Sequence, residues 1–245
     1  MNLLVLTYHY FHDERPLGIK AEDHAFSMNH DRFENHLRQL NSSDLEIIDP
    51  TKAENGQWPP SDAHRQVMIT IDDGHQSFGD LAVDKMIQHK IPAVLPVIAG
   101  QVGQTDYLDW SALRYLATVG FSVQSHSMTH VNLARLTEDQ CRDELRRSKE
   151  TIEDQIGVPV TMLAAPMGRI NRTVSECAAQ IGYSLIMTSY TGINTEPDDL
   201  KLLKRFQVKS HMDKLPLDDY YKPLSSLRLI GSTKNMVKRL RNGWR

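Results

Sequence analysis

The chain alternates short apolar runs with longer stretches in which apolar residues recur every three or four positions. The short runs predict buried strands at Leu3–Tyr8, Glu46–Ile48, Val67–Ile71, Ala93–Val97, Phe121–Gln124, Thr161–Ala164, Ser184–Met187 and Arg205–Val208. The longer stretches predict amphipathic helices around the apolar sets Phe33-Leu37-Leu40, Leu81-Met86-Ile87 and Leu113-Leu116-Val119. About eight strands alternating with helices indicate a parallel α/β fold, either an open doubly wound sheet or a (β/α) barrel.

Signals at helix ends support several of these helices. Asp31 with Glu34, and Thr137 with Gln140, have the spacing of a capping box, which satisfies free N–H groups at a helix N-terminus. Three glycines follow the last apolar position of a predicted helix, where a left-handed C-cap is expected: Gly120, Gly157 and Gly182.

We expect one domain over residues 1–224 and a basic tail over residues 225–245. A chain of 245 residues, 40% hydrophobic and 24% charged, can bury a core of ordinary size. The tail carries six lysines and arginines and no acid, whereas the whole chain has a net charge of −3. The rest of the chain is therefore more acidic than the total suggests.

Apolar residues of the tail recur at near-helical spacing, with basic residues mostly between them: Leu227, Ile230, Val237, Leu240 and Trp244. This pattern is typical of an interfacial helix that makes peripheral contact with an anionic membrane. A helix that packs on the domain, or a disordered chain end, fits the same residues. The sequence leaves these interpretations open.

Net charge, cysteine content and hydropathy limit the classes of protein that fit this sequence. A net charge of −3 argues against a nucleic-acid partner. Cys141 and Cys177 do not make a disulfide framework, and we expect both to be reduced. No signal-peptide pattern precedes Thr7, and no apolar run approaches the ~18 residues of a membrane span. We therefore expect a cytoplasmic protein, or one at the inner face of the membrane if the tail binds lipid.

Polar and ionisable residues follow several predicted strands directly. In parallel α/β folds, functional side chains lie on loops beyond the C-terminal ends of the strands. The residues delivered there are His9, Asp72-Asp73-Gly74, Ser125 to His130, and Ala165-Pro166-Met167-Gly168. Together they predict a concentrated site.

Asp72 and Asp73 are adjacent carboxylates after an apolar strand. Neighbouring residues on an extended backbone point in different directions. One carboxylate could therefore bind a metal while the other faces a water molecule. Taken alone, however, Asp-Asp-Gly is also a common turn composition.

His126 and His130 stand four positions apart, a spacing that would place both on one face of a helical turn. Asp73 could supply a third ligand from a neighbouring strand end. Two imidazoles and one carboxylate, with room left for water, are typical of a catalytic metal site. We expect one divalent ion, Zn²⁺ first, with Co²⁺, Ni²⁺ or Mn²⁺ as alternatives.

The motifs resemble those of a known family. Thr70 to Gly74, followed by His126 to His130, is similar to the first two motifs of the NodB-homology polysaccharide deacetylases, carbohydrate esterase family 4. Leu163 to Gly168 resembles the third motif in its proline-and-glycine form. The likeness runs from about Leu3 to Val208 and leaves the basic tail outside. It implies a distorted (β/α) barrel of about seven or eight strands.

The resemblance also implies roles for the residues. Asp73, His126 and His130 would hold the metal, and Asp72 would be the catalytic base. A backbone N–H near Met167 would stabilise the tetrahedral oxyanion. An acid must then protonate the departing amine, because otherwise the intermediate reverts.

Two departures from the family pattern concern the base and the acid. Where the third motif often carries an arginine that orients the base, this chain has Ala164. The late motif that supplies the acid has no clean copy; His211 is a poor match to it and is the alternative acid. His9 is the preferred acid, because the first strand lies beside the last in a closed barrel. A hydrogen-bonded histidine at a strand end is the alternative for His9.

Several residues were considered as substrate contacts or as bystanders. Pro166, Met167 and Gly168 are expected to bind substrate. Trp110 could stack on a sugar ring or begin a helix as core packing. His75 fits a pocket or a solvated loop. The remaining histidines are expected at the surface: His12, His24, His30, His36, His64 and His89.

The sequence thus predicts a metal-dependent hydrolase that removes an N-acetyl group, or an O-acetyl or formyl group, from a sugar or polysaccharide. The partner would be an acetylated sugar or glycan, with a lipid-linked one as a variant. Two alternatives remain: a hydrolase of a non-sugar amide, and a catalytically weak carbohydrate-binding relative.

Overall fold

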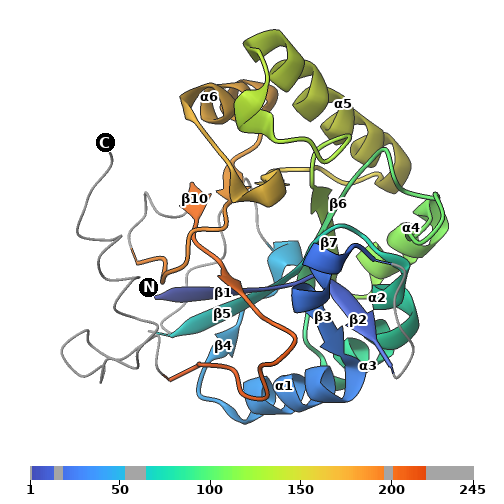
Figure 1. Cartoon of the computed structure of the whole chain (residues 1–245), viewed down its shortest axis with the longest axis vertical. Helices are drawn as coiled ribbons and strands as arrows, with labels where there is room; N and C mark the ends of the chain where they lie inside the picture. The colour runs from blue at the N-terminus through green and yellow to red at the C-terminus, as the bar shows by residue number, and fades with distance from the viewer. Residues whose placement is uncertain (1, 14–18, 53–64, 196–200, 219–245) are drawn as a thin grey trace. The chain divides into compact units, whose positions relative to one another are not determined.

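The computed structural model describes residues 2–13, 19–52, 65–195 and 201–218. Its central feature is a curled sheet in which every pairing between strands is parallel (Figure 1). Among the described residues the order is β10-β9-β8-β7-β6-β5-β1-β11, with β4 also on β5. The first strand lies beside the last, as expected for this barrel. The predicted distorted (β/α) barrel is confirmed.

The strands of this sheet are β1 (Leu3–Tyr8), β4 (Glu46–Ile47), β5 (Gln66–Ile71), β6 (Ala93–Val97), β7 (Phe121–Ser125), β8 (Met162–Ala164), β9 (Leu185–Met187), β10 (Leu202–Leu203) and β11 (Phe206–Gln207). A small parallel ribbon of β2 (Tyr10–His12) and β3 (Ser27–Asn29) follows β1 and was not predicted. Its strands are only three residues long and lack a clear alternation of polar and apolar positions.

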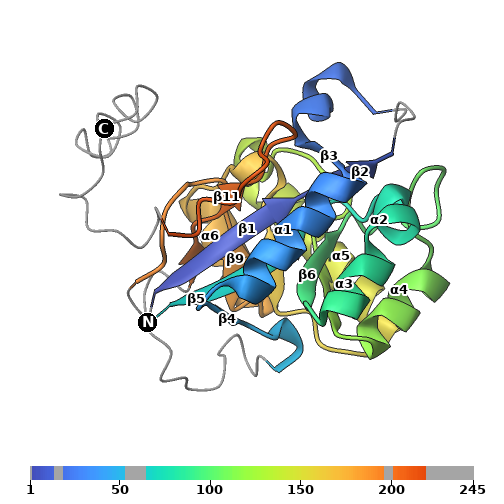
Figure 2. The same cartoon turned by 90° about the horizontal axis from the view of Figure 1, so that it is seen from below.

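The helices are α1 (His30–Ser42), α2 (Gln76–Leu81), α3 (Val83–His89), α4 (Trp110–Thr118), α5 (Glu138–Ile156) and α6 (Arg172–Ile181). They cover the outer face of the sheet: Figures 1 and 2 show α1 beneath β1 and β5, and α4 and α5 pack on β7. Short 3₁₀ segments lie at Ala21–Phe26, Pro50–Lys52, Leu133–Arg135 and Pro166–Gly168.

Alternation along the strands separates two buried faces. One cluster of buried residues comes from strands at both ends of the sheet, so it lies on the concave face: Leu3, Val5, Ile48, Met68, Val94, Met162, Ala164, Leu185, Met187 and Leu203. Leu4, Leu6, Val67 and Ile69 alternate with them and are buried on the convex face. Continued along β1 and β5, the concave face passes through Thr7 and Thr70, which are polar. The apolar core thus gives way to polar side chains at one end of the barrel.

Of the two capping boxes predicted at helix N-termini, one is confirmed and the other is wrong. Thr137 and Gln140 form the expected capping box at the start of α5. Gly157 and Gly182 take the left-handed conformation after α5 and α6. The predicted box of Asp31 with Glu34 is wrong, because α1 is capped by the Asn29 side chain, which accepts bonds from the N–H groups of Asp31 and Arg32.

The prediction that His36 lies at the surface is also wrong. Its side chain is fully buried in α1, with Nδ1 3.2 Å from the Tyr8 hydroxyl and Nε2 2.9 Å from the Met212 carbonyl. Burial lowers the pKa of His36 to about 4, so the ring is neutral near pH 7. Because its partners lie 28 and 176 positions away, the local polar sequence around His36 gave no sign of burial.

Contacts divide the chain into a unit of residues 1–215 and a second of residues 216–245. The tail residues used above, from Leu227 to Trp244, lie outside the described residues, so membrane contact stays a prediction. In the described part of the chain, no helix has the length and apolarity to cross a membrane. Cys141 in α5 and Cys177 in α6 are buried and free, as expected for reduced thiols.

Candidate functional site

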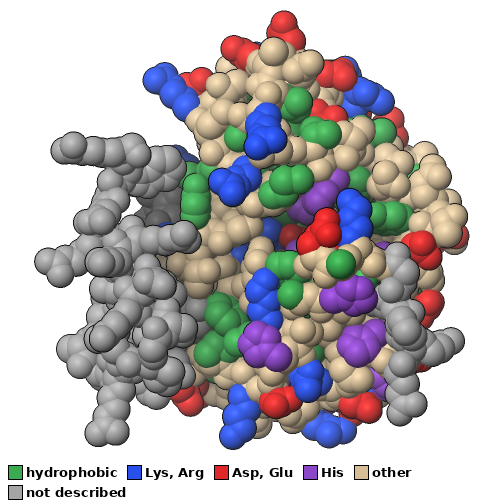
Figure 3. All heavy atoms as spheres, in the orientation of Figure 1, with side chains coloured by type: hydrophobic (Ala, Val, Ile, Leu, Met, Phe, Trp, Pro, Cys, Tyr) green, Lys and Arg blue, Asp and Glu red, His purple; other side chains and the backbone are tan. Residues whose placement is uncertain are grey.

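A cavity of about 470 Å³ lies where the C-terminal ends of the strands meet. His9 follows β1, Asp72 and Asp73 follow β5, and His126 follows β7, so the barrel brings together side chains far apart in sequence. The loops after β8 and β9 also contribute to the cavity wall. On the face in Figure 3, histidine side chains lie beside acidic and basic ones near the centre.

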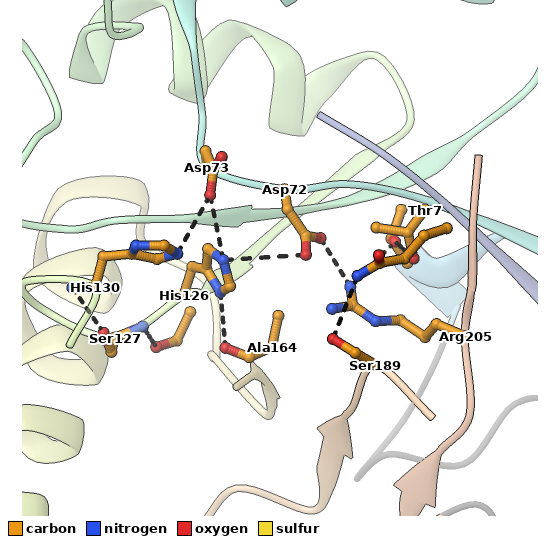
Figure 4. Close-up of polar contacts among 12 residues, drawn as sticks. Thr7, Asp72, Asp73, His126, Ser127, His130, Ala164, Ser189 and Arg205 are labelled. Atoms are coloured by element: carbon orange, nitrogen blue, oxygen red, sulfur yellow. Dashed lines mark hydrogen bonds and ion pairs between the residues drawn. The ribbon is translucent and has the colours of Figure 1, made fainter. Parts of the chain in front are cut away.

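Asp73, His126 and His130 form a group that could hold a metal ion, since their ligand atoms all lie within 4.8 Å of one another. Nε2 of His126 is 3.2 Å from Asp73 Oδ1, and Nε2 of His130 is 3.7 Å from the same oxygen (Figure 4). Among the described residues, Oδ1 is buried and has no hydrogen-bond partner of good geometry. Three donors that converge on one point without bonding one another well fit a cation between them.

A backbone contact sets the tautomer of His126. Its Nδ1 lies 2.8 Å from the carbonyl oxygen of Ala164, which can only accept, so Nδ1 carries the proton. Nε2 is then left with its lone pair facing Asp73. This arrangement, in which one ring nitrogen is fixed by a carbonyl and the other is free, is the usual one for a metal-binding histidine.

Electrostatics couple the three residues strongly. Burial acts to lower the pKa of His126, but Asp73 and Asp72 outweigh it and raise that pKa. Burial acts to raise the pKa of Asp73, but His126, His9 and His130 outweigh it and hold the pKa far below its ordinary value. Asp73 is therefore an ionised, buried carboxylate, and a divalent cation bound beside it would supply positive charge.

The loop that carries the two histidines is not the helical turn expected from their spacing. Residues 126–130 form an irregular loop in which Ser127 (φ 64°) and His130 (φ 60°) adopt left-handed backbone conformations. The Ser127 hydroxyl accepts a bond from the His130 N–H at 3.1 Å and closes the loop. Asp73 is left-handed as well (φ 77°). Such conformations are unfavourable for residues other than glycine and concentrate at functional sites.

Asp72 lies beside the metal-binding group and is paired with a buried arginine. Nη1 of Arg205 donates to Asp72 Oδ1 at 2.8 Å, while Asp72 Oδ2 faces Nε2 of His126 at 4.0 Å (Figure 4). Both Asp72 and Arg205 are about 2% exposed. Burial acts to raise the pKa of Asp72, but Arg205, His126 and His9 outweigh it and lower that pKa. Asp72 is therefore ionised, with one oxygen held and the other directed toward the cavity.

Arg205 carries no clear functional signal in the sequence, where it begins the predicted strand Arg205–Val208. It lies between β10 and β11, and its side chain also donates to the Thr188 carbonyl at 2.9 Å and to the Thr70 hydroxyl at 3.3 Å. It thus places an arginine beside Asp72, which Ala164 does not. A single arginine within an otherwise apolar strand signal was the only hint in the sequence.

His9 lines the cavity together with Asp72, Asp73 and His126, whereas His211 is exposed and is not among the lining residues. The His9 ring lies 4.9 Å from the ring of Phe26, centre to centre. Its Nδ1 is buried and makes no hydrogen bond to the described residues. Burial lowers the pKa of His9, while Asp72 and Asp73 act in the opposite direction. The alternative in which His9 is merely a hydrogen-bonded histidine at a strand end therefore finds no hydrogen bond at Nδ1 among the described residues.

The loop after β8 brings Met167 and Gly168 to the cavity wall, while Pro166 is buried and not among the lining residues. The Met167 backbone is left-handed (φ 58°), and the residue is 58% exposed, so it forms an apolar part of the cavity edge. At Gly168 (φ 63°) a Cβ would lie 2.0 Å from the Ser189 hydroxyl oxygen, so only glycine fits. Trp110 begins α4 and is not among the lining residues either.

One wall of the cavity was not predicted from the sequence. Tyr10, His75 and Tyr107 line it as a row of rings, with 5.1 Å between the ring centres of Tyr10 and His75 and 6.0 Å between those of His75 and Tyr107. The segment Ala21–Phe26 adds Asp23 and Phe26. Of these residues, only His75 is a candidate pocket residue from the sequence. Tyr10 begins the three-residue strand β2, and Asp23 and Phe26 lie in the short 3₁₀ segment Ala21–Phe26, neither of which a sequence signal marks.

Comparisons with known proteins agree with this picture. The family model described as polysaccharide deacetylase matches residues 60–186. The putative polysaccharide deacetylase YxkH of Bacillus subtilis is 24% identical over 86% of this chain and 72% of its own length. The peptidoglycan-N-acetylglucosamine deacetylase PgdA of Listeria monocytogenes is 26% identical over 57% of this chain and 29% of its own length.

Among solved structures, the deacetylase PplD of Streptococcus pyogenes, in complex with acetate, has a TM-score of 0.77 at 24% identity. The match covers 91% of this chain and 99% of that one, which shows that the fold is shared. The chain spans less than a third of the length of the Listeria relative, so the two share one region only. Since the family model covers more than half of the sequence, the chain belongs to the polysaccharide deacetylase family.

Proposed function

We propose that this protein is a metal-dependent deacetylase that removes an N-acetyl group from a sugar or glycan. The observation that carries the proposal is the cavity in which the Asp73, His126 and His130 group lies beside the Arg205-paired Asp72. The family is that of polysaccharide deacetylases, and the Listeria relative is named for N-acetylglucosamine in peptidoglycan. These names support an N-acetylated sugar over an O-acetyl or formyl substrate.

Asp73, His126 and His130 would hold a divalent metal, for which Zn²⁺ suits two imidazoles and a carboxylate. When bound, such an ion polarises the acyl carbonyl and makes water more acidic. The chain's own residues supply the proton transfers. Asp72 Oδ2, left free by the bond from Arg205 to Oδ1, takes a proton from the attacking water.

The collapse of the intermediate needs a proton on the amine nitrogen. Two of the described lining imidazoles are outside the metal group, His9 and His75, and of these His9 is the one that interacts electrostatically with Asp72. A depressed pKa makes the imidazolium of His9 a strong acid once it carries a proton, which favours transfer to the amine. A backbone N–H near Met167 would stabilise the oxyanion.

Replacing His9 by glutamine should lower kcat by about 10²-fold, at the low end for general acid catalysis, because water in an open cavity can supply part of the proton. Metal content should stay unchanged, since His9 is not part of the metal-binding group. Acetate release and metal analysis on the same preparation would check both points. His211→Gln is the matched control and should keep full activity. Wild-type kcat for His9→Gln would exclude His9 as the acid.

The substrate is tested by acetate release from a panel of N-acetylated sugars: polymeric, oligomeric, lipid-linked and nucleotide-linked. Each is assayed after chelation, and again after Zn²⁺, Co²⁺, Ni²⁺ or Mn²⁺ is added back. We expect release from at least one sugar, and only with metal. Release from small amides alone would favour the non-sugar hydrolase, whereas sugar binding without release would favour the carbohydrate-binding alternative. The Arg205–Asp72 pair supports turnover over that last alternative, because an arginine lies beside the proposed base although Ala164 supplies none.

A further inference from the structure

Tyr10 is the first residue of β2 and follows His9 directly. Its hydroxyl donates a hydrogen bond to Asp73 Oδ2 at 2.8 Å. Tyr10 takes no part in the proton transfers proposed for Asp72 and His9. The contact nevertheless ends on the one carboxylate of the candidate metal-binding group.

The two oxygens of Asp73 therefore have different partners. Oδ1 faces Nε2 of His126 at 3.2 Å and Nε2 of His130 at 3.7 Å, whereas Oδ2 is held by Tyr10. The hydroxyl occupies one lone pair of Oδ2 and holds that oxygen toward Tyr10, which favours metal binding through Oδ1 alone. Two imidazoles and one oxygen then leave room for water and the acyl oxygen, as catalytic metal sites require.

Tyr10 is itself fixed by its neighbours. Its ring meets the edge of the His75 ring at 5.1 Å, and His75 is anchored because its Nδ1 accepts a bond from the Ser77 N–H at the start of α2. The Ser77 hydroxyl in turn accepts a bond from the N–H of Phe11, the next residue of β2. The hydroxyl of Tyr10 is thus positioned from both the ring side and the backbone side. A carboxylate oxygen can only accept, so the Tyr10 hydroxyl is the donor in this bond.

We propose that Tyr10 is a positioning residue that holds Asp73 as a one-oxygen ligand, so that a divalent metal keeps an open position for water and substrate. The inference rests on the metal-binding part of the proposed function. It does not depend on which sugar is the substrate.

The test compares Tyr10→Phe with Tyr107→Phe. Both remove one hydroxyl from a cavity-lining ring, and Tyr10 is the one that bonds Asp73. Zn²⁺ affinity is measured by competition with a chelator, and the visible spectrum of the Co²⁺-loaded protein reports the coordination number. Neither measurement needs substrate or turnover. The melting temperature of the metal-free protein checks that each variant folds.

We expect Tyr10→Phe to weaken Zn²⁺ binding by 10–100-fold, the usual effect of removing a partner of a metal ligand. We also expect it to change the Co²⁺ spectrum toward a higher coordination number, as Asp73 becomes free to bind through both oxygens. Tyr107→Phe should change neither. A Tyr10→Phe protein with wild-type Zn²⁺ affinity and an unchanged Co²⁺ spectrum would overturn the inference. If the wild-type protein bound metal but deacetylated no sugar, the proposed function would be wrong. The comparison of Tyr10→Phe with Tyr107→Phe could still be interpreted, because it measures metal binding alone.

Discussion

Replacing His130 by alanine should abolish stable metal binding and, with it, acetate release. Its imidazole supplies one of the three donors that converge at Asp73 Oδ1, and two donors hold Zn²⁺ poorly. His130 is the variant of choice because its side chain is 36% exposed, whereas that of His126 is 3% exposed and bonded to a carbonyl. Truncating His130 should therefore leave the fold intact. Metal content after dialysis, with acetate release on the same sample, measures the result.

Asp72→Asn is the matched control for His130→Ala. The amide keeps the size of the carboxylate but cannot take a proton, so kcat should fall by about 10²–10⁴-fold while the metal is retained. The two variants thus separate metal binding from base catalysis. If His130→Ala released acetate at the normal rate, or if Asp72→Asn lost the metal as well, the assignment of the two roles would be wrong.

Replacing Arg205 by methionine should destabilise the protein by roughly 3–5 kcal/mol, because it leaves the buried Asp72 carboxylate without its positive partner. The Arg205 side chain also donates hydrogen bonds to Thr188 and Thr70. Its loss should therefore weaken the contacts between the last strands and β5. Acetate release should fall too, since the pKa of Asp72 would rise and Oδ1 would no longer be held. Urea unfolding and kcat on the same variant measure the two effects.

The double variant Arg205→Met with Asp72→Asn separates charge from packing. It removes both partners, so it should recover part of the stability lost by Arg205→Met alone while remaining inactive. A double variant less stable than either single one would mean that Arg205 acts through Thr70 and Thr188. Full stability and activity in the single Arg205→Met variant would contradict the proposed role altogether.

The fold followed from the sequence because its signals are local. Each buried strand is a short apolar run, and alternation within Leu3–Tyr8 and Gln66–Ile71 reflects the concave and convex faces of one sheet. The ribbon of β2 and β3 escaped prediction because three residues cannot establish a period. The buried His36 escaped because its polar neighbours in α1 lie on the exposed side.

The candidate site was predictable only in part, and partly for the wrong reason. The spacing of His126 and His130 predicts a helical turn, yet a loop with left-handed residues brings the two rings together. Asp72 and Asp73 were marked because two adjacent carboxylates are conspicuous. The contacts of Arg205 with Asp72 and of Tyr10 with Asp73 span 133 and 63 positions. Nothing in the local sequence reports such pairings, because they arise only when the barrel curls.

Because Arg205 lies late in the sequence, the site is completed late as the chain is synthesised. Asp73, His126 and His130 have all emerged by residue 130, but the partner of Asp72 arrives 75 residues later and must dock between β10 and β11. Contacts of long sequence separation form late in folding, since the loop they close is costly in entropy. A chain that ends before Arg205 would therefore contain Asp72 and the metal donors but not the arginine that holds Asp72 Oδ1. Activity should thus depend on the last strands being in place.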